Sequence, residues 1–479
     1  MYRRTVPGQI KMDIPFNVPL SSDSKWVKLA DQMPWDLVEQ EYEKHFEGAE
    51  GQIAKPSRLA FGALYIQISE GFTDEQTTEN IRDNPAMQYF CGFESYNPVP
   101  PFDQSMMTRF RKRIPSDTIM RITEMAFTGD ALMEMEPAAE IPAADDKSET
   151  EEPPAEGDSN QPEVSNRGAL IVDATCFPQD IHYPTDVGLL NWCRELLELI
   201  IDVLFGLVSD KFKVKPRTYR IEARKVYLSF AKARKHTVSK IRKQIRAQLQ
   251  YVARDLRIIE DFISKGADLS VLPDQIQEKY QTIKTVYRQQ KEMYDNGTHK
   301  CEDRIVSISQ PHIRPIVRGK EHKPTEFGAK VAIALISGYS FITDISWDNI
   351  SEATLLPEAA EQYKRMFGFY PRVIIGDSAY INRVNQAWCK GKNIRLSGPR
   401  RGRKSEDFKR EEAKLLAEEG CMRNAVEGKF GLLKRKYGLE IIMTKLPDTS
   451  MSVIAMGFFV SNMERRLRRL SRAQSKLAA

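Results

Sequence analysis

The chain has 479 residues, of which 41% are hydrophobic and 29% charged. These proportions are typical of a globular protein large enough for two or three domains. No stretch approaches the roughly 20 consecutive apolar residues of a membrane span, and the start MYRRTVPGQIKMDIPF lacks the apolar run of a secretory signal. We therefore expect a protein of the cytoplasm that does not contact membranes.

The cysteines and histidines form no recognisable site. Six of each are scattered along the chain without a CxxC pair, an HExxH motif or a zinc-finger spacing. This pattern disfavours a structural zinc site and a disulfide framework, and most of the cysteines are expected to be packing residues.

The net charge of +5 is unevenly distributed. Residues 134–166 contain eleven acids and one base, so this segment carries −10 and the rest of the chain +15. The segment is rich in Pro and Ala and has almost no large apolar side chains, which predicts a disordered acidic linker between domains. The basic remainder indicates a polyanionic partner such as DNA or RNA.

Residues 1–133 are predicted to form a helical N-terminal domain. Thr73 begins a capping-box pattern, Asn84 precedes a proline at a first helical position, and Asp103 and Ser116 are expected to cap further helices. One of these helices is strongly basic, which predicts a helix-turn-helix-like domain that binds DNA ends. The alternative is a small helical bundle with a solvated basic face. The candidate DNA-binding residues here are Arg109, Arg111, Lys112 and Arg113.

A second basic region follows the linker. The apolar run GALIVDATCF predicts a buried strand, and a helical segment over about 188–295 comes next. Between residues 211 and 257 there are sixteen Lys and Arg against two acids, with aromatic residues interleaved. Such one-sided charge favours contact with a phosphate backbone, although an exposed arm without a ligand remains the alternative. The candidate residues are Lys232, Arg234, Lys235, Arg242 and Lys243.

The remaining elements predict a mixed α/β core over residues 167–479, interrupted by that helical insertion. Strands are expected at RIVSIS, IRPIVRG, KVAIALISGYSFITDISW, RVIIGD and NIRLSG. Helices are expected at ATLLPEAAEQYKRMFG, near INRVNQAWCK, and from about Cys421 onward. A basic loop within GPRRGRK should follow the DNA backbone, with Arg400, Arg401, Arg403 and Lys404 as its candidates.

Two apolar strand runs end in an acid, at Asp173 and at Asp377. Ligands of open α/β sheets bind beyond the carboxyl ends of the strands, so two such acids would meet in one cleft. Their mutual repulsion calls for a cation, and oxygen ligands select Mg²⁺ or Mn²⁺. Each aspartate taken alone could equally be a helix cap or a turn residue.

A third acid, Glu427, lies in CMRNAVEGKFGLLKRKYGL. Apolar residues recur there at helical spacing from Val426 to Tyr437, and Arg423, Glu427 and Lys434 fall within about 40° of one another beside that stripe. Glu427 could therefore be a metal ligand between two phosphate-binding cations. The alternative is an ordinary ion pair between Arg423 and Glu427.

Together these segments resemble bacterial insertion-sequence transposases with an RNase H-like catalytic core. The resemblance covers most of the chain, and the segments that carry it are LIVDATCFPQDIHYPTD, RIVSISQPHIRPIVRGK, PTEFGAK, GYSFITDISWDN, VIIGDSAYINRVNQ, IRLSGPRRGR and NAVEGKFGLLKRKYGL. It implies that Asp173, Asp377 and Glu427 are the DDE triad. It also implies that Arg423 and Lys434 belong to the Tyr-Arg-Glu-Lys signature around the last acid, although the tyrosine position is Gly420 here.

The resemblance implies an enzyme that binds the ends of its element and performs metal-dependent DNA strand cleavage and strand transfer. Two Mg²⁺ or Mn²⁺ ions per active site would activate the attacking oxygen and stabilise the leaving one. The expected partners are the terminal repeats and the target DNA, bound by a homodimer on paired ends in the bacterial cytoplasm, at the nucleoid.

Three other functions are alternatives to a transposase: a relative that binds DNA without cutting it, another RNase H-like nuclease, and a structural protein. The complete triad disfavours the first, and the helical domain with its basic insertion disfavours the second. The two strand-end aspartates disfavour the third.

Two further features of the sequence have two possible interpretations each. Trp347 could stack an unpaired base or belong to a core, and the basic tail from Met463 could contact DNA or form an amphipathic helix.

Overall fold

The computed structural model describes residues 20–46, 53–135, 165–317, 325–398 and 406–478. They form a mixed α/β protein with two compact units. The sheet unit comprises residues 1–178, 329–346 and 350–479, and the helical unit comprises residues 179–328 and 347–349. The basic loop 400–404 and nearly all of the predicted acidic linker lie outside the described residues.

The N-terminal part of the sheet unit is helical, as the sequence predicts. Thr73 and Gln76 form the predicted capping box, and Asn84 caps the following helix through the amides of Ala86 and Met87. Two predicted caps are wrong, because Ser105 and Pro115 occupy the cap positions where Asp103 and Ser116 were expected. The helices are α1 Lys25–Gln32, α2 Trp35–Glu43, α3 Ser57–Glu70, α4 Asp74–Asp83, α5 Pro85–Phe90, α6 Met106–Arg113 and α7 Ser116–Met133.

The strand order of the sheet is β4-β3-β1-β5-β6. β2 pairs with residues 325–327 at the start of β3, whereas β4 pairs with residues 330–336. β3 and β4 pair antiparallel, whereas β5 is parallel to both β1 and β6. The strands are β1 Ala169–Pro178, β2 Pro315–Val317, β3 Thr325–Ile336, β4 Tyr339–Ser346, β5 Val373–Ile375 and β6 Arg395–Leu396. The strand predicted at RIVSIS is wrong: Ile305 and Ile308 instead pack as irregular chain against the core of the helical unit.

Four helices follow in the sheet unit: α12 Leu356–Phe367, α13 Arg383–Gly391, α14 Glu406–Lys436 and α15 Pro447–Ala478. The predicted start of the long helix near Cys421 is wrong, because α14 begins at Glu406. Its first half is rich in Glu, Lys, Ala and Leu, which favour a helix without producing an apolar stripe.

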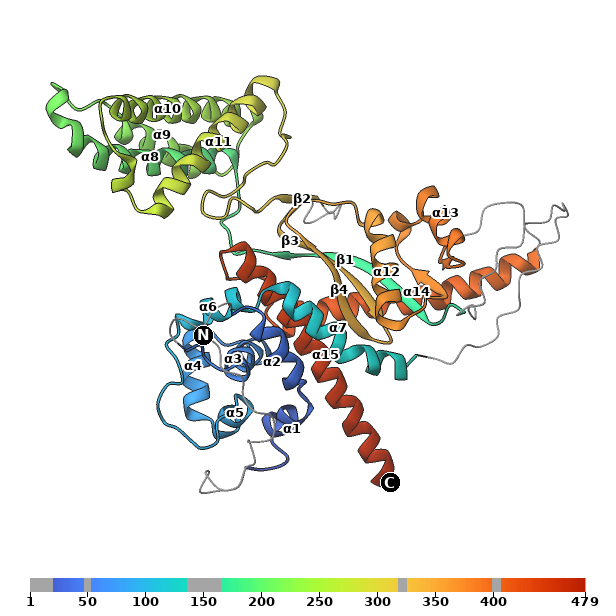
Figure 1. Cartoon of the computed structure of the whole chain (residues 1–479). Helices are drawn as coiled ribbons and strands as arrows, with labels where there is room; N and C mark the ends of the chain where they lie inside the picture. Colours follow the sequence, from blue (N-terminus) through green and yellow to red (C-terminus); the bar gives the residue numbers. More distant parts are fainter. Residues whose placement is uncertain (1–19, 47–52, 136–164, 318–324, 399–405, 479) are drawn as a thin grey trace, which may run out of the picture. The chain divides into compact units, whose positions relative to one another are not determined.

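Helix α15 joins the N-terminal helices to the sheet. It packs against α3, α6, α7 and β4, as Figure 1 lets the reader follow. Phe459 forms edge-to-face and tilted ring contacts with Phe61 and Phe127. Asn462 accepts a hydrogen bond from the Ser340 amide at 3.0 Å and donates one to its carbonyl at 2.9 Å. The N-terminal helices therefore share one compact unit with the sheet.

The helical unit contains α8 Asp186–Val208, α9 Arg220–Ala231, α10 Val238–Ser264 and α11 Asp274–Asn296. Helices α8 and α10 pack along each other around a continuous apolar core (Figure 1). These helices occupy the region predicted as a helical insertion. Among the helices that the structure describes, none has both the length and the apolar character needed to cross a membrane.

Candidate functional site

Two of the predicted acids meet at the centre of the sheet. Asp173 lies within β1, which continues to Pro178, so the prediction that it ends the strand is wrong. The last paired residues of the parallel register are Ile171 and Ile375, and Asp173 and Asp377 each follow two residues later. Asp377 caps a short 3-10 turn, accepting a hydrogen bond from the Ala379 amide at 2.8 Å.

The electrostatics of Asp173 identify its neighbours. Burial raises the pKa of Asp173 to about 6, and Glu352 and Asp377 raise it as well. The Ala174 amide, which donates to Asp173 at 2.8 Å, and Arg423 act in the opposite direction. Asp377, Glu352 and Arg423 therefore lie close enough to Asp173 to act on its charge.

Glu352 was not predicted from the sequence. Its carboxylate forms an ion pair with Lys330 of β3 at 3.0 Å, and both side chains are largely buried. Burial raises the pKa of Tyr380, and Glu352, Asp173 and Asp377 raise it further, so one tyrosine lies among three acids. The sequence offered little signal, because an acid at the start of a helix is common for its interaction with the helix dipole.

Asn385 connects the two turns that carry Glu352 and Asp377. Its buried side chain donates hydrogen bonds to the carbonyl oxygens of Ala353 at 2.9 Å and Tyr380 at 3.0 Å. The two turns are therefore held in a fixed relation.

The third predicted acid, Glu427, lies exposed on α14, which packs against β1. Arg423 acts on Asp173, and the Lys434 Nζ atom lies 5.6 Å from the Phe177 ring centroid, so Glu427 lies between two points where α14 approaches β1. In the part of the chain that the structure describes, Glu427 does not pair with Arg423, and no three His, Cys, Asp or Glu are close enough to hold a metal ion. The structure thus assembles Asp173, Asp377 and Arg423, and leaves Glu427 beyond ligand distance.

The chemistry of these acids fits a divalent cation. They offer only carboxylate oxygens, the donors that Mg²⁺ and Mn²⁺ prefer. The repulsion between Asp173 and Asp377 that contributes to the raised pKa is also the interaction that a bound cation would relieve.

The predicted DNA-binding residues of α6 do not share one environment. Arg109, Lys112 and Arg113 are exposed, and Arg113 also donates a hydrogen bond to the His45 carbonyl at 3.0 Å. Arg111 is buried and forms an ion pair with Asp74. Its assignment as a DNA contact is therefore wrong, because the guanidinium is used inside the sheet unit.

The predicted cations of the helical unit are all exposed. Lys232, Arg234 and Lys235 lie in the connection between α9 and α10, whereas Arg242 and Lys243 lie on α10, with Arg242 over the Tyr294 ring at 4.5 Å. Trp347 is partly buried and packs edge-on against the His312 ring, at a centroid distance of 4.4 Å.

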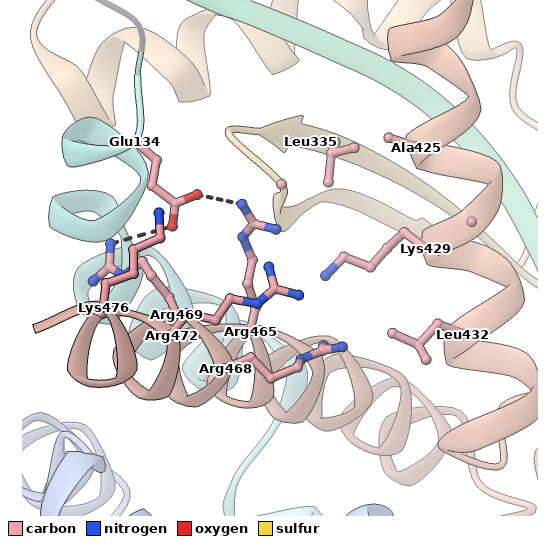
Figure 2. Close-up of a pocket in the computed structure, with 13 residues that line it drawn as sticks. Glu134, Leu335, Ala425, Lys429, Leu432, Arg465, Arg468, Arg469, Arg472 and Lys476 are labelled. Atoms are coloured by element: carbon pink, nitrogen blue, oxygen red, sulfur yellow. Dashed lines mark hydrogen bonds and ion pairs between the residues drawn. The ribbon is translucent and has the colours of Figure 1, made fainter. Parts of the chain in front are cut away.

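A cavity of about 610 Å³ lies between α14 and α15, and Figure 2 shows its lining. We call it the α14–α15 pocket. The charged residues that line it are Glu134, Lys429, Arg465, Arg468, Arg469, Arg472 and Lys476. Burial lowers the pKa of Lys429 to about 7, and Arg465 and Arg468 lower it further, which reflects the excess of positive charge.

Comparisons with known proteins identify two segments. A family model described as "Transposase DDE domain" matches residues 374–464, and one described as "Transposase domain (DUF772)" matches residues 16–113. These two segments of the chain are therefore similar to transposase domains, one of them a DDE domain. A Rhizobium meliloti protein described as "Uncharacterized protein ORF8 in nfe locus" is 35% identical over 88 residues, which cover 18% of this chain and 42% of that protein. No solved structure matches the chain.

Of the two matched segments, only the DDE segment contains residues of the acidic site. The DDE segment contains Asp377, Arg423, Glu427 and Lys434, and ends within α15, whereas Asp173 lies outside it. The N-terminal segment ends at Arg113, the last residue of α6. The first acid of the site is therefore assigned only from its geometry and from its place in the sequence.

Proposed function

We propose that the protein is an insertion-sequence DDE transposase, which binds the ends of its element and cleaves and joins DNA strands there, using Asp173, Asp377 and Glu427. The observation that carries the proposal is that Asp377, just beyond β5, lies close enough to Asp173 on the adjacent parallel strand β1 for its charge to add to burial in raising the pKa of Asp173. A purely structural pair of aspartates would not be expected to face each other in this way without a counter-ion.

The sheet supports an RNase H-like core. β1 lies at its centre, between the antiparallel β3–β4 hairpin and the parallel strands β5 and β6. In this arrangement Asp173 is fixed on a central strand. Asp377 lies just beyond the neighbouring strand, where ligands of α/β sheets bind.

Asp173, Asp377 and Glu427 would hold two Mg²⁺ or Mn²⁺ ions, which polarise a phosphate and lower the pKa of an attacking hydroxyl. Glu427 lies one helical turn from Arg423, on the stretch of α14 that approaches β1. Arg423 and Lys434 would bind phosphate oxygens on either side of it.

The exposed cations supply affinity for the double-stranded DNA of the terminal repeats and the target. Arg109, Lys112 and Arg113 would bind near the element ends, and the cations of α9 and α10 would contact backbone phosphates. Arg400, Arg401, Arg403 and Lys404 belong to the same proposal on sequence grounds alone. We place the active form in the bacterial cytoplasm as a homodimer on paired ends.

The direct test is nicking and strand transfer on a supercoiled plasmid that carries the DNA flanking the coding region, with Mg²⁺ present. Asp173→Asn, Asp377→Asn and Glu427→Gln should each abolish both reactions and leave DNA affinity near wild type, because an amide keeps the shape of the side chain and loses its charge. Ca²⁺ in place of Mg²⁺ should support binding with little or no cleavage, because its coordination is looser. Arg423→Ala and Lys434→Ala should reduce the rates less severely.

Asp344→Asn is the matched control, since Asp344 is a partly buried acid of β4, two strands away from β1. It should retain cleavage. If Glu427→Gln cleaved as well as Asp344→Asn, Glu427 would not be the third acid. If wild-type protein bound the plasmid and never nicked it, the chain would be a DNA-binding relative without catalysis.

A further inference from the structure

The α14–α15 pocket is lined by regularly spaced residues of both helices. On α14 its lining residues are Ala425, Gly428, Lys429 and Leu432, and their spacing places them on one helical face. Glu427 is about 150° from the centre of that face at 100° per residue. The pocket therefore opens on the side of α14 opposite to the predicted catalytic acid.

Helix α15 changes character along its length. Its first half, which includes Ile454, Phe459 and Met463, is buried in the core of the sheet unit. From Arg465 onward the side facing the pocket carries a row of cations. Arg465 and Arg469 have structural partners, since they pair with Glu134, and Arg469 also pairs with Asp130.

The other cations of the pocket have no such partner. Among the described residues, Arg468, Arg472 and Lys476 form no ion pair with a carboxylate. Lys429 points from α14 toward α15, as Figure 2 shows. Among the described residues, its ammonium group donates to two neutral acceptors, Ser461 Oγ at 3.0 Å and Asn462 Oδ1 at 3.5 Å.

The backbone leaves room for Arg465, the first cation of this row. Gly338, in the turn between β3 and β4, has a φ of +78°, and a Cβ there would lie 2.4 Å from the Arg465 guanidinium carbon. Arg468, Arg472 and Lys476 are exposed to solvent along the same cavity. Like charges that line one cavity repel one another, and a bound anion would relieve this repulsion.

The geometry points to the backbone phosphates of double-stranded DNA as the ligand of the α14–α15 pocket. Arg465, Arg468, Arg472 and Lys476 lie on one face of α15 and span about 16 Å at 1.5 Å per residue. A single small anion would engage only part of this row, whereas a nucleic-acid strand presents a phosphate at every step. The choice of DNA rests on the proposed transposase function.

Because the pocket faces away from Glu427, the phosphates it binds are not those at the cleavage point. The pocket holds a more distant stretch of the bound DNA. It should therefore contribute affinity and leave the chemical step unchanged. This separation makes it testable independently of catalysis.

The test compares two triple variants of the full chain, by fluorescence anisotropy on a labelled duplex of arbitrary sequence over a range of salt concentrations. Arg468→Gln, Arg472→Gln and Lys476→Gln together should lower affinity at least tenfold at about 0.1 M salt and reduce the slope of log K against log salt by about 2 to 3. The matched control removes three exposed cations of the same unit, Lys28→Gln, Arg365→Gln and Lys390→Gln. It should change the slope much less.

A third variant, with Arg468→Lys and Arg472→Lys, keeps the charge and should keep most of the slope, which separates phosphate binding from packing of the arginine stems. At saturating DNA the Gln variant should cleave at the wild-type rate, whereas Asp377→Asn should lose cleavage and keep the slope. The two proposals can therefore fail independently.

An unchanged slope in the Gln variant, or an equal loss in the control, would overturn the assignment. So would a rise in DNA affinity, because that result would mean that the pocket is occupied by the acidic segment of the chain itself.

Discussion

Asp255 of α10 is a buried acid without a hydrogen-bond partner. Its side chain is fully buried, and in the described structure neither carboxylate oxygen has a hydrogen-bond partner. The charged groups that face it are Glu198 and Arg194 of α8, Arg220 of α9 and Arg254 of its own helix. Burial raises the pKa of Asp255 to about 8, and Glu198 raises it further against the three arginines.

The sign of the pH dependence follows from this pKa. In the unfolded chain Asp255 titrates near its ordinary value of 3.8, whereas the folded unit retains the proton up to about pH 8. Between these limits unfolding releases a proton, so stability falls as pH rises, by up to about 1.4 kcal/mol per pH unit. From pH 5 to pH 7 the helical unit should lose up to about 3 kcal/mol. Burial also raises the pKa of Glu198, which adds to the same trend.

Native-state hydrogen exchange of the full chain measures this effect, because it reports the opening free energy of α8 and α10 separately from that of the sheet unit. Asp255→Asn keeps the size of the side chain and removes its ionisation, so the fall in stability between pH 5 and pH 7 should shrink by more than half. Asp261→Asn, which alters a partly exposed acid of the same helix, should leave the wild-type fall intact. A wild-type opening free energy that did not change with pH, or an unchanged fall in Asp255→Asn, would refute the reasoning.

Three other changes have expected outcomes. Asn385→Ala should slow strand cleavage about 10- to 100-fold and leave DNA affinity within about twofold of wild type, because the loss of its two buried hydrogen bonds loosens the turns that carry Glu352 and Asp377. The control is Asn382→Ala, which removes the cap of the same helix. Equal slowing of cleavage in both variants would contradict a positioning role for Asn385. Neutralising the helical-unit cations should weaken binding to all DNA sequences alike and flatten the salt dependence, whereas an unchanged slope would return the segment to a solvated arm. The residues to neutralise are Lys232, Arg234, Lys235, Arg242 and Lys243. Deleting about 20 residues of 136–164 should preserve the cooperative thermal transition of the sheet unit, which calorimetry measures, because long loops change stability little.

The elements with strong local patterns were predictable from the sequence. The capping box at Thr73 and the Asn84-Pro85 start were recognised because a few adjacent residues determine them. β1 and β5 were recognised from short apolar runs. The strand predicted at 305–308 is irregular chain in the structure. An apolar run indicates that a segment is buried, but it does not indicate which element packs over that segment.

The candidate site was only partly predictable for a related reason. Asp173 and Asp377 could be paired because two parallel strands bring their ends together. Glu352, Lys330 and Asn385 come from separate segments, and their contacts arise only when β3, the turn before α12 and α13 come together. The prediction that Arg111 contacts DNA was wrong, because a basic cluster in the sequence does not reveal which of its members has an acid partner inside the protein.

In the proposed function, helix α14 separates two tasks, catalysis and DNA binding. Glu427 and Arg423 lie on the side that approaches β1, and Lys429 lies on the side that faces α15. A helix presents residues two apart to opposite sides, so the proposed catalytic acid and the proposed backbone contact can be neighbours in sequence without sharing a phosphate. A higher DNA concentration should therefore restore cleavage in variants that lack the pocket cations, whereas it should not restore cleavage in variants that lack Glu427. Measuring cleavage against DNA concentration for both kinds of variant distinguishes the two sides of this one helix.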